Sequence, residues 1–285
     1  MSSETTTTTV TELIQAAIAE ARYTVSQGVF LGDPRYITRN DKPMGKSGVT
    51  FPKWDAEAMA SVAEGTDLTN TPFDTTAVTI TPGEYGLMTT VTDLADMRAS
   101  EDVFMGIGKV MGEAYRDAVN QAIYALFDGF SNATGTSNVD ITEANIRAAV
   151  RELRLRKTPG ELFLAVTPHV QEDIMGLYAT STSVTADYIR NTIFEKGTLP
   201  PLYGVTPVLI DNLAAGTGTG GIDEADTKTA IWSRDALGMV VEWDFKIEMD
   251  RDISLRATEV VATASFGVGE INDNYGQEFL VDNKD

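Results

Sequence analysis

Residues 77–92 read AVTITPGEYGLMTTVT and residues 100–129 read SEDVFMGIGKVMGEAYRDAVNQAIYALFDG, so a β segment leads almost directly into a long amphipathic helix. Threonines alternate with apolar residues in the first stretch, which is typical of a strand. Similar signals begin at Val49 and are interrupted by turn residues around Gly65. Residues 49–92 therefore predict a long projecting hairpin with an irregular tip, too poor in large apolar residues to fold alone.

The helix is expected to begin at Ser100–Asp102, where acidic residues suit the positive end of the helix dipole, and to end at the glycine stop Asp128–Gly129. About 29 helical residues would span roughly 43 Å. Its apolar residues recur at helical spacing along two lines: Val103, Ile107, Val110, Ala114, Ala118, Ala122 and Leu126, and Met111, Tyr115, Val119, Ile123 and Phe127. This wide apolar face predicts a central helix.

Before the hairpin, the sequence predicts a short helix and an arm. Apolar residues recur at helical spacing up to Gly28: Val10, Leu13, Ile14, Ala17, Ile18, Ala21 and Val25. From Val29 to Gly48, Pro, Gly, Asn, Asp and Lys replace this pattern, which indicates an extended segment that cannot form its own core. A disordered leader and a strap across a neighbouring subunit both fit this segment.

After the long helix, Thr142 is expected to cap a second helix that ends near Lys157, with Ile141 and Ile146 as its hydrophobic staple. The further elements that the sequence predicts are a buried strand at 162–166, a helix at 168–177, a strand at 207–210, and strands at 240–243 and 253–264. This order predicts an α+β fold, in which a compact mixed domain is flanked by pieces of a second domain.

The composition narrows the possible functions. A chain of 285 residues with 42% hydrophobic content can bury a sizeable core. Its 42 acidic and 22 basic residues give a formal charge of -20, which repels nucleic acid and anionic membranes. The absence of cysteine excludes disulfides, thiolate zinc sites and a cysteine nucleophile. No signal peptide is apparent and no apolar run approaches the roughly 20 residues of a membrane span, so we expect no membrane partner.

No motif points to an enzyme, a metal site or a cofactor. Gly45–Lys46–Ser47 lacks the first glycine of a phosphate-binding loop, because Asn40 stands in its place. Asp250–Ser254 lacks the glycine of a calcium loop, since Leu255 occupies that position. The only histidine, His169, is expected to be a partly buried helix residue.

Three other features are assigned structural roles. The glycine-rich loop at 214–221 is expected to be a connector, and the acidic cluster Asp223–Asp226 is expected to be solvated. We interpret Trp54, Trp232 and Trp243 as core or interface anchors. A soluble hydrolase that uses acidic residues of the middle domain stays open as an alternative, because sequence cannot exclude a catalytic carboxylate pair.

In this order of elements the chain resembles the major capsid protein family of tailed bacteriophages. The stretches that resemble family sequences are Phe51–Pro52 and Val62–Gly65 in the extended loop, Val91–Leu94 before the spine helix, Ala118–Gly129 at its end, Tyr203–Val208 in the axial domain and Asp252–Ala257 in the last long strand. The resemblance implies the phage major capsid protein fold. Its expected parts are an N-terminal arm at 1–48, a long β-hairpin extended loop at 49–92, a peripheral domain with the spine helix at 93–135 and 246–285, and a mixed α/β axial domain at 136–245.

The resemblance also implies a function: hexamers and pentamers of an icosahedral shell that encloses packaged double-stranded DNA. The protein would act by self-assembly and not as an enzyme. Within the same fold, the alternative is the shell of an encapsulin-like nanocompartment. Apolar residues of the arm and hairpin are expected to lie on adjacent subunits: Val10, Leu13, Phe51, Trp54, Val78 and Ile80.

Further partners and a location follow from the same resemblance. Since the chain has no room for a scaffolding segment, we expect a separate scaffolding protein, together with a portal and a possible decoration protein. The packaged DNA is expected to be bound without sequence specificity, and assembly to take place in the host cytoplasm before the protein resides in the virion. Some family members crosslink a lysine to an asparagine; Lys53 with Asn272 or Asn274 is conceivable, but we expect no crosslink.

Overall fold

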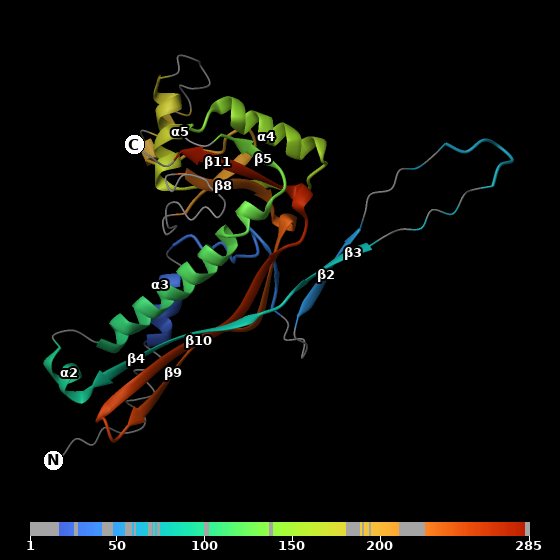
Figure 1. The fold of residues 1–285 in the computed structure, drawn as a ribbon. Coiled ribbons are helices and arrows are strands. Elements are labelled where there is room, and N and C mark those ends of the chain that lie inside the picture. The colour runs from blue at the N-terminus through green and yellow to red at the C-terminus, as the bar shows by residue number, and fades with distance from the viewer. Residues whose placement is uncertain are drawn as a thin grey trace.

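The computed structural model describes residues 17–25, 28–41, 48–54, 59, 61–67, 70, 72, 75–99, 103–136, 139–180, 189, 191–193, 195–210 and 226–282. Figure 1 shows an elongated body with a long sheet at one end, a compact sheet with helices at the other, and a hairpin that projects sideways. The combination of helices with sheets whose strands pair mostly antiparallel confirms the predicted α+β class.

The long sheet has four strands in the order β1–β9–β10–β4. Its strands are β1 (Thr38–Asn40), β9 (Leu237–Asp252), β10 (Ala257–Glu270) and β4 (Gly83–Thr92). Strand β10 pairs antiparallel with both β9 and β4, while β1 pairs parallel with β9. Strand β4 therefore belongs to this sheet, and the hairpin predicted over 49–92 ends at Ile80.

The hairpin itself consists of β2 (Val49–Trp54) and β3 (Thr75–Ile80), which pair antiparallel. Only Thr81 and Pro82 separate β3 from β4. Proline contributes no N–H to a sheet, so a strand break at this position is favoured.

The long helix is α3 (Val103–Tyr124), which has 22 residues and is followed by the 3-10 turn η1 (Phe127–Gly129). It ends earlier than predicted, because the chain tightens into this 3-10 turn before the glycine stop. The start predicted at Ser100–Asp102 lies outside the described residues. The sequence prediction missed a short helix, α2 (Asp93–Arg98), in which the Thr92 hydroxyl accepts a hydrogen bond from the Ala95 amide.

The second sheet has five strands in the order β5–β11–β8–β6–β7. They are β5 (Ala133–Gly135), β11 (Gly276–Asp282), β8 (Asp226–Ser233), β6 (Leu162–Val166) and β7 (Val205–Leu209). Helices α4 (Glu143–Leu155) and α5 (Pro168–Thr180) pack on this sheet, as Figure 1 shows. Short 3-10 turns, η2 (Arg234–Ala236) and η3 (Asp273–Tyr275), precede β9 and β11.

Helix α4 forms where the sequence predicts it. The Thr142 side chain accepts a hydrogen bond from the Asn145 amide at 3.2 Å and caps the helix. Ile141 and Ile146 are both buried, which confirms the predicted hydrophobic staple. The strand at 162–166 is likewise confirmed and fully buried.

The turn between β9 and β10 corrects the strand predicted over 253–264. Residues 253–256 form a turn, because the Asp252 carboxylate accepts hydrogen bonds from the Ser254 amide, the Ser254 hydroxyl and the Leu255 amide. The side chains of Ile253 and Leu255 point into solvent, with exposed fractions of 83% and 60%.

The predicted arm is also corrected, because residues 28–41 lie on their own chain. The Leu31 amide donates a hydrogen bond to Asn120 Oδ1 at 2.9 Å, and Asn120 Nδ2 donates to the Val29 carbonyl at 2.8 Å. Leu31 and Ile37 are buried in the main core. This segment carries few apolar residues, but α3 and β9 supply the rest of the core around them.

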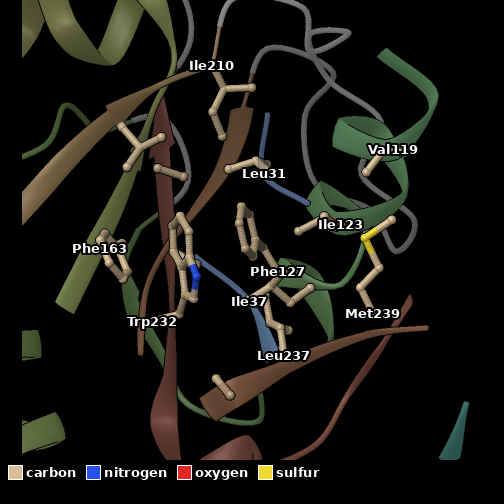
Figure 2. Packing of buried hydrophobic residues seen from close by; sticks show 14 of the residues in the cluster. Leu31, Ile37, Val119, Ile123, Phe127, Phe163, Ile210, Trp232, Leu237 and Met239 are labelled. Atoms are coloured by element: carbon tan, nitrogen blue, oxygen red, sulfur yellow. The ribbon is translucent and has the colours of Figure 1, made fainter. Parts of the chain in front are cut away.

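Figure 2 shows the core that joins the two sheets. Trp232 of β8 packs against Phe127 after α3, with ring centroids 4.9 Å apart, and against Phe163 of β6 at 5.9 Å. The Trp232 indole nitrogen donates a hydrogen bond to the Tyr36 carbonyl at 2.9 Å. One hydrophobic core therefore connects the long sheet, the five-stranded sheet and the segment at residues 28–41.

Candidate assembly surfaces

The hairpin has one face turned to the body and one face turned to solvent. Its alternating pattern places Val49, Phe51 and Val78 with the buried Ile80 against Val240 of β9. Trp54, at the end of β2, lies on the other face and is 69% exposed. Further along the loop, Met59 is fully exposed, so the projecting part carries large apolar groups that its own chain does not cover.

The root of the hairpin crosses the long sheet over three glycines. A β-carbon added at Gly267 would lie 2.5 Å from the Thr81 carbonyl oxygen, and one added at Gly238 or Gly269 would lie 2.9 Å from Ile80 side-chain atoms. Real β-carbons do not approach other atoms so closely, so the glycines permit this crossing. The direction in which the hairpin leaves the body is therefore set by the close contacts of Thr81 and Ile80 with these glycines.

A second uncovered surface is the groove between α3 and β4, which we call the α3–β4 groove. It contains a cavity of about 260 Å³ whose lining is predominantly apolar. Tyr85 and Leu87 of β4 form its rim, and each is nearly half exposed. Its helix side and floor are formed by Ala114, Ala118, Met111, Tyr115, Phe245 and Ala262.

The two apolar lines of α3 have different surroundings. The line of Met111, Tyr115, Val119, Ile123 and Phe127 is fully buried in the chain's own core. On the other line, Val110 is 59% exposed and Ala114 is exposed, where the helix borders the α3–β4 groove. The helix is thus apolar over a wider arc than its own chain covers.

The aromatic side chains at the floor and rim of the groove are held by ring contacts. Tyr115 stacks with Phe245 at 5.1 Å between ring centroids, and Tyr85 stacks with Phe266 at 4.2 Å. Burial raises the pKa of Tyr115 to about 12, so its hydroxyl is neutral over the physiological range. The residues that line the groove are all uncharged.

The third uncovered surface is the far end of the long sheet, which we call the sheet tip. Arg251 donates hydrogen bonds to both oxygens of Asp93, at 2.9 and 2.7 Å, and this pair joins β9 to α2. Around it, four large apolar side chains are more than half exposed: Leu94, Met97, Ile253 and Leu255.

Comparison with known proteins identifies the family of the chain that carries these surfaces. A model of the family described as phage capsid protein matches residues 75–274, which include α3, β3 of the hairpin and every strand of the two sheets except β1 and β11. The chain belongs to the phage capsid protein family. No curated protein sequence matches it.

Solved structures show the same fold for this phage capsid protein. The capsid structure of the cyanophage P-SCSP1u is similar with a TM-score of 0.70 and 14% identity over 87% of each chain. The head structure of the Helicobacter pylori bacteriophage KHP40 gives 0.69 and 11% identity, over 90% of this chain and 89% of that one. The virus-like particle from Pyrococcus furiosus gives 0.61 and 12% identity, over 94% of this chain and 99% of that one.

The family match confirms the resemblance and the role of major capsid protein that the sequence predicts. The virion capsid is therefore the location of the protein, and copies of the chain associate with one another in a shell. The match to a phage family favours a phage capsid over the encapsulin-like alternative.

The structure places the six predicted interface residues of the capsid protein in different settings. Val10 and Leu13 lie outside the described residues. Ile80 is buried within its own chain, and Phe51 and Val78 pack partly against it. Trp54 alone of the six is exposed among the described residues. Sequence reasoning missed the α3–β4 groove, although the apolar line of α3 that includes Val110 and Ala114 was a signal of it.

Several residues of the capsid protein were candidates for a catalytic, phosphate-binding or metal-binding role. His169 is exposed at the start of α5, contrary to the expected partial burial, because Val170 is the residue of this first turn that packs into the core with β6. The glycine-rich loop at 214–221 lies outside the described residues, as do Asp223–Ala225. Within the described part of the chain, no three metal-ligating side chains cluster, and no helix is long and apolar enough to cross a bilayer.

The residues considered for a crosslink lie near the hairpin root of the capsid protein. The Asn272 side chain accepts a hydrogen bond from the Asn274 amide and so caps η3 of its own chain. Burial and the neighbouring Asp273 raise the pKa of Glu270, and the charge of Lys53 opposes this rise. Lys53 thus interacts electrostatically with Glu270 of its own chain.

Proposed function

We propose that this capsid subunit builds the hexamers and pentamers of an icosahedral shell around the double-stranded DNA of a tailed bacteriophage. The observation that carries the proposal is the projecting hairpin, whose exposed face bears Trp54 while its own body lies on the other side. An isolated two-stranded ribbon is marginal in water, so contact with neighbouring subunits supplies burial that the single chain lacks.

The proposed interface combines the hairpin with the segment at the N-terminus. Trp54, with the partly covered Phe51 and Val78, lies on an adjacent subunit, and Val10 and Leu13 extend the same contact. Ile80 supports it from within, since it anchors the hairpin root to β9.

The proposed division of the subunit has an N-terminal arm at 1–48, an extended loop at 49–92, a peripheral domain at 93–135 and 246–285, and an axial domain at 136–245. The strand pairing supports a refinement. Residues 83–92 form β4 of the long sheet and residues 38–40 form β1, so both segments join the peripheral part. The projecting extended loop is then confined to 49–80.

Assembly, not catalysis, is the proposed role. A formal charge of -20 lets packaged DNA lie in the shell without tight, sequence-specific adhesion, because phosphates are repelled. Scaffolding and portal proteins, with a possible decoration protein, would be the partners of assembly in the host cytoplasm.

Electron microscopy of the purified chain, with nucleic-acid extraction from the particles, tests the proposal. We expect closed shells, and DNA inside those isolated from infected cells. Shells that contain enzymes and no genome would favour a nanocompartment, and a catalytically active monomer of 30.8 kDa would favour a hydrolase. DNA that leaves opened shells only at high salt would contradict the weak adhesion.

A further inference from the structure

We infer that helix α4 carries the surface of the capsid subunit that contacts the phosphates of packaged DNA. The surface consists of Arg147, Arg151, Arg154 and Lys157, which we call the α4 basic stripe. This inference rests on the proposed function and deepens it, because it names the residues at which the subunit meets the genome.

Basic residues are concentrated in α4 and just after it, although the chain as a whole is acidic. Five of the 22 lysines and arginines lie within residues 147–157, and Glu152 is the single acidic residue of this stretch. The formal charge of the whole chain is -20. At physiological ionic strength the field of a charge decays over about 8 Å, so distant carboxylates do not cancel this local positive charge. An anionic partner is therefore attracted to α4, while most of the surface repels it.

The stripe is exposed along one side of the helix. Arg147, Arg151 and Arg154 are spaced by four and three residues, so they share a side of α4 and extend over about 10 Å of its axis. The side chains of Arg147 and Arg151 are 58% and 69% exposed, and Arg154 and Lys157 are exposed as well. Another side of the helix packs on the five-stranded sheet, and Figure 1 shows α4 on the outside of the compact end.

Two arginines of the stripe have carboxylate neighbours that a phosphate can replace. Arg147 lies 3.7 Å from a carboxylate oxygen of Glu143, which also accepts a hydrogen bond from the Tyr203 hydroxyl. Arg151 pairs with Glu152 at 2.7 Å. Ion pairs that are exposed in this way contribute little to stability, so the guanidinium groups stay available to another anion.

The end of the stripe is held in place on the sheet. Lys157 follows the helix with a φ of 59°, a conformation that favours glycine, so a cation stands there against the local backbone preference. No described carboxylate forms an ion pair with Lys157 or Arg154. Arg156 donates hydrogen bonds to the Gly276 carbonyl at 3.3 Å and to Gln277 Oε1 at 2.8 Å, which ties this end of α4 to β11.

The chemistry of the stripe favours phosphate over a protein partner. A guanidinium group can donate two parallel hydrogen bonds to a phosphate. Leu155 is the one large apolar side chain exposed on α4, so this helix lacks the apolar centre that is typical of a protein interface. Phosphate contacts carry no base sequence, which agrees with the unspecific DNA binding proposed above. With at most four phosphates for each subunit, the contact is weak and sensitive to salt.

Chemical protection of arginines tests the contact in natural particles. Phenylglyoxal reacts with accessible guanidinium groups, and mass spectrometry identifies the modified residues in DNA-filled particles and in particles opened and emptied with nuclease. We expect modification of Arg151 and Arg154 to be several-fold lower in the filled particles. Arg98, which is exposed on α2, is the control and should react equally in both. Equal modification of Arg151 and Arg154 in both would overturn the inference.

Variants of the full-length chain test the same residues by charge. The probe is a labelled DNA duplex of about 20 bp, whose binding is followed by fluorescence anisotropy between roughly 50 and 200 mM salt. Arg151→Gln/Arg154→Gln is expected to reduce the slope of log affinity against log salt by about 1.8, because each phosphate contact contributes about 0.9. Arg98→Gln/Lys109→Gln removes the same charge from two other exposed sites and should keep the natural slope, as should Arg151→Lys/Arg154→Lys. Circular dichroism checks that each variant folds.

The outcomes separate this inference from its alternative and from the proposed function. A natural chain that binds no duplex, or equal slopes for the stripe variant and its control, would overturn the inference. Polyglutamate is the probe for an acidic protein partner, and tighter binding of polyglutamate than of the duplex would likewise overturn it. In these cases, natural particles that contain DNA leave the shell function standing, whereas natural particles without DNA would overturn both.

Discussion

The carbonyl oxygen of Ala21 lies so close to Gly112 of α3 that a β-carbon added at this glycine would be 2.5 Å from it. One turn earlier, the Ala17 carbonyl has the same relationship to Gly108. The helix at residues 17–25 therefore rests backbone to backbone on α3, and both alanines are fully buried. This contact explains why an apparently peripheral helix is an ordered part of the subunit.

Gly112→Ala is expected to destabilise the subunit by about 1–3 kcal/mol, because the added methyl group must displace the 17–25 helix. Gly106→Ala is the control on the same helix, where no other atom lies within 4 Å of the added carbon. It is expected to stabilise by about 0.5–1 kcal/mol, since alanine favours a helix. Urea unfolding followed by circular dichroism measures both, and equal effects of the two changes would refute the close contact.

Asn120→Ala is expected to loosen the segment at 28–41. The change leaves the Leu31 amide and the Val29 carbonyl without their partner, at a cost of about 1–3 kcal/mol for a buried unsatisfied group. Hydrogen exchange should show faster exchange of the Leu31 amide. The neighbouring, exposed Gln121 supplies the control, because Gln121→Ala should change stability by less than about 0.5 kcal/mol. Unchanged exchange at Leu31 would contradict the assignment.

Gly267→Ala is expected to displace the hairpin root, because the new methyl group meets the Thr81 carbonyl at 2.5 Å. Limited trypsin digestion after the half-buried Lys53 should become several-fold faster. Gly83→Ala is the control in β4, where the nearest atom to an added β-carbon is 3.9 Å away, in the Tyr85 ring. Digestion of Gly267→Ala at the natural rate would show that the root tolerates the extra carbon.

The ion pair at the sheet tip gives a pH dependence with a definite sign. The hydrogen bonds and charge of Arg251 lower the pKa of Asp93 below its ordinary value of 3.8. The stability from this pair is therefore fully present above pH 4 or so and is lost as the pH falls through the lowered pKa of the folded state. Asp93→Asn should be less stable than the natural chain at pH 7, and the difference should shrink toward pH 2.

Urea midpoints at several pH values measure this effect, which is expected to be small because the pair is exposed. Asp96→Asn, on the same helix, is the control, and its difference from the natural chain should not follow the same course. A difference for Asp93→Asn that stays constant down to pH 2 would exclude the ion pair as its cause.

Local signals in the sequence were sufficient where one short stretch determines the structure. The cap at Thr142 and the staple of Ile141 with Ile146 define the start of α4 from neighbouring residues alone. The buried strand β6 was readable from its continuous apolar run at 162–166. The order of hairpin, helix and mixed domain was sufficient to indicate the capsid family.

The errors occur where distant contacts determine the outcome. Alternating apolar residues at Ile253 and Leu255 mimic a strand, but the hydrogen bonds to Asp252 turn the chain back there. Leu31 and Ile37 show no periodicity, yet α3 and β9 bury them. For the candidate interface, the sequence indicated an apolar hairpin but could not show which of its faces the body covers. That choice depends on the pairing of β2 with β3 above Val240.

The two-residue link between β3 and β4 has a mechanical consequence. Because Thr81 and Pro82 leave almost no slack, tension applied by a neighbour to the hairpin passes directly into β4. Strand β4 pairs with β10 along its whole length, from Gly83 opposite Phe266 to Thr92 opposite Ala257. A pull along the strand loads these hydrogen bonds together in shear, instead of peeling them one after another. If the hairpin contacts a neighbouring subunit as proposed, the long sheet is the element that carries force from one subunit into the next.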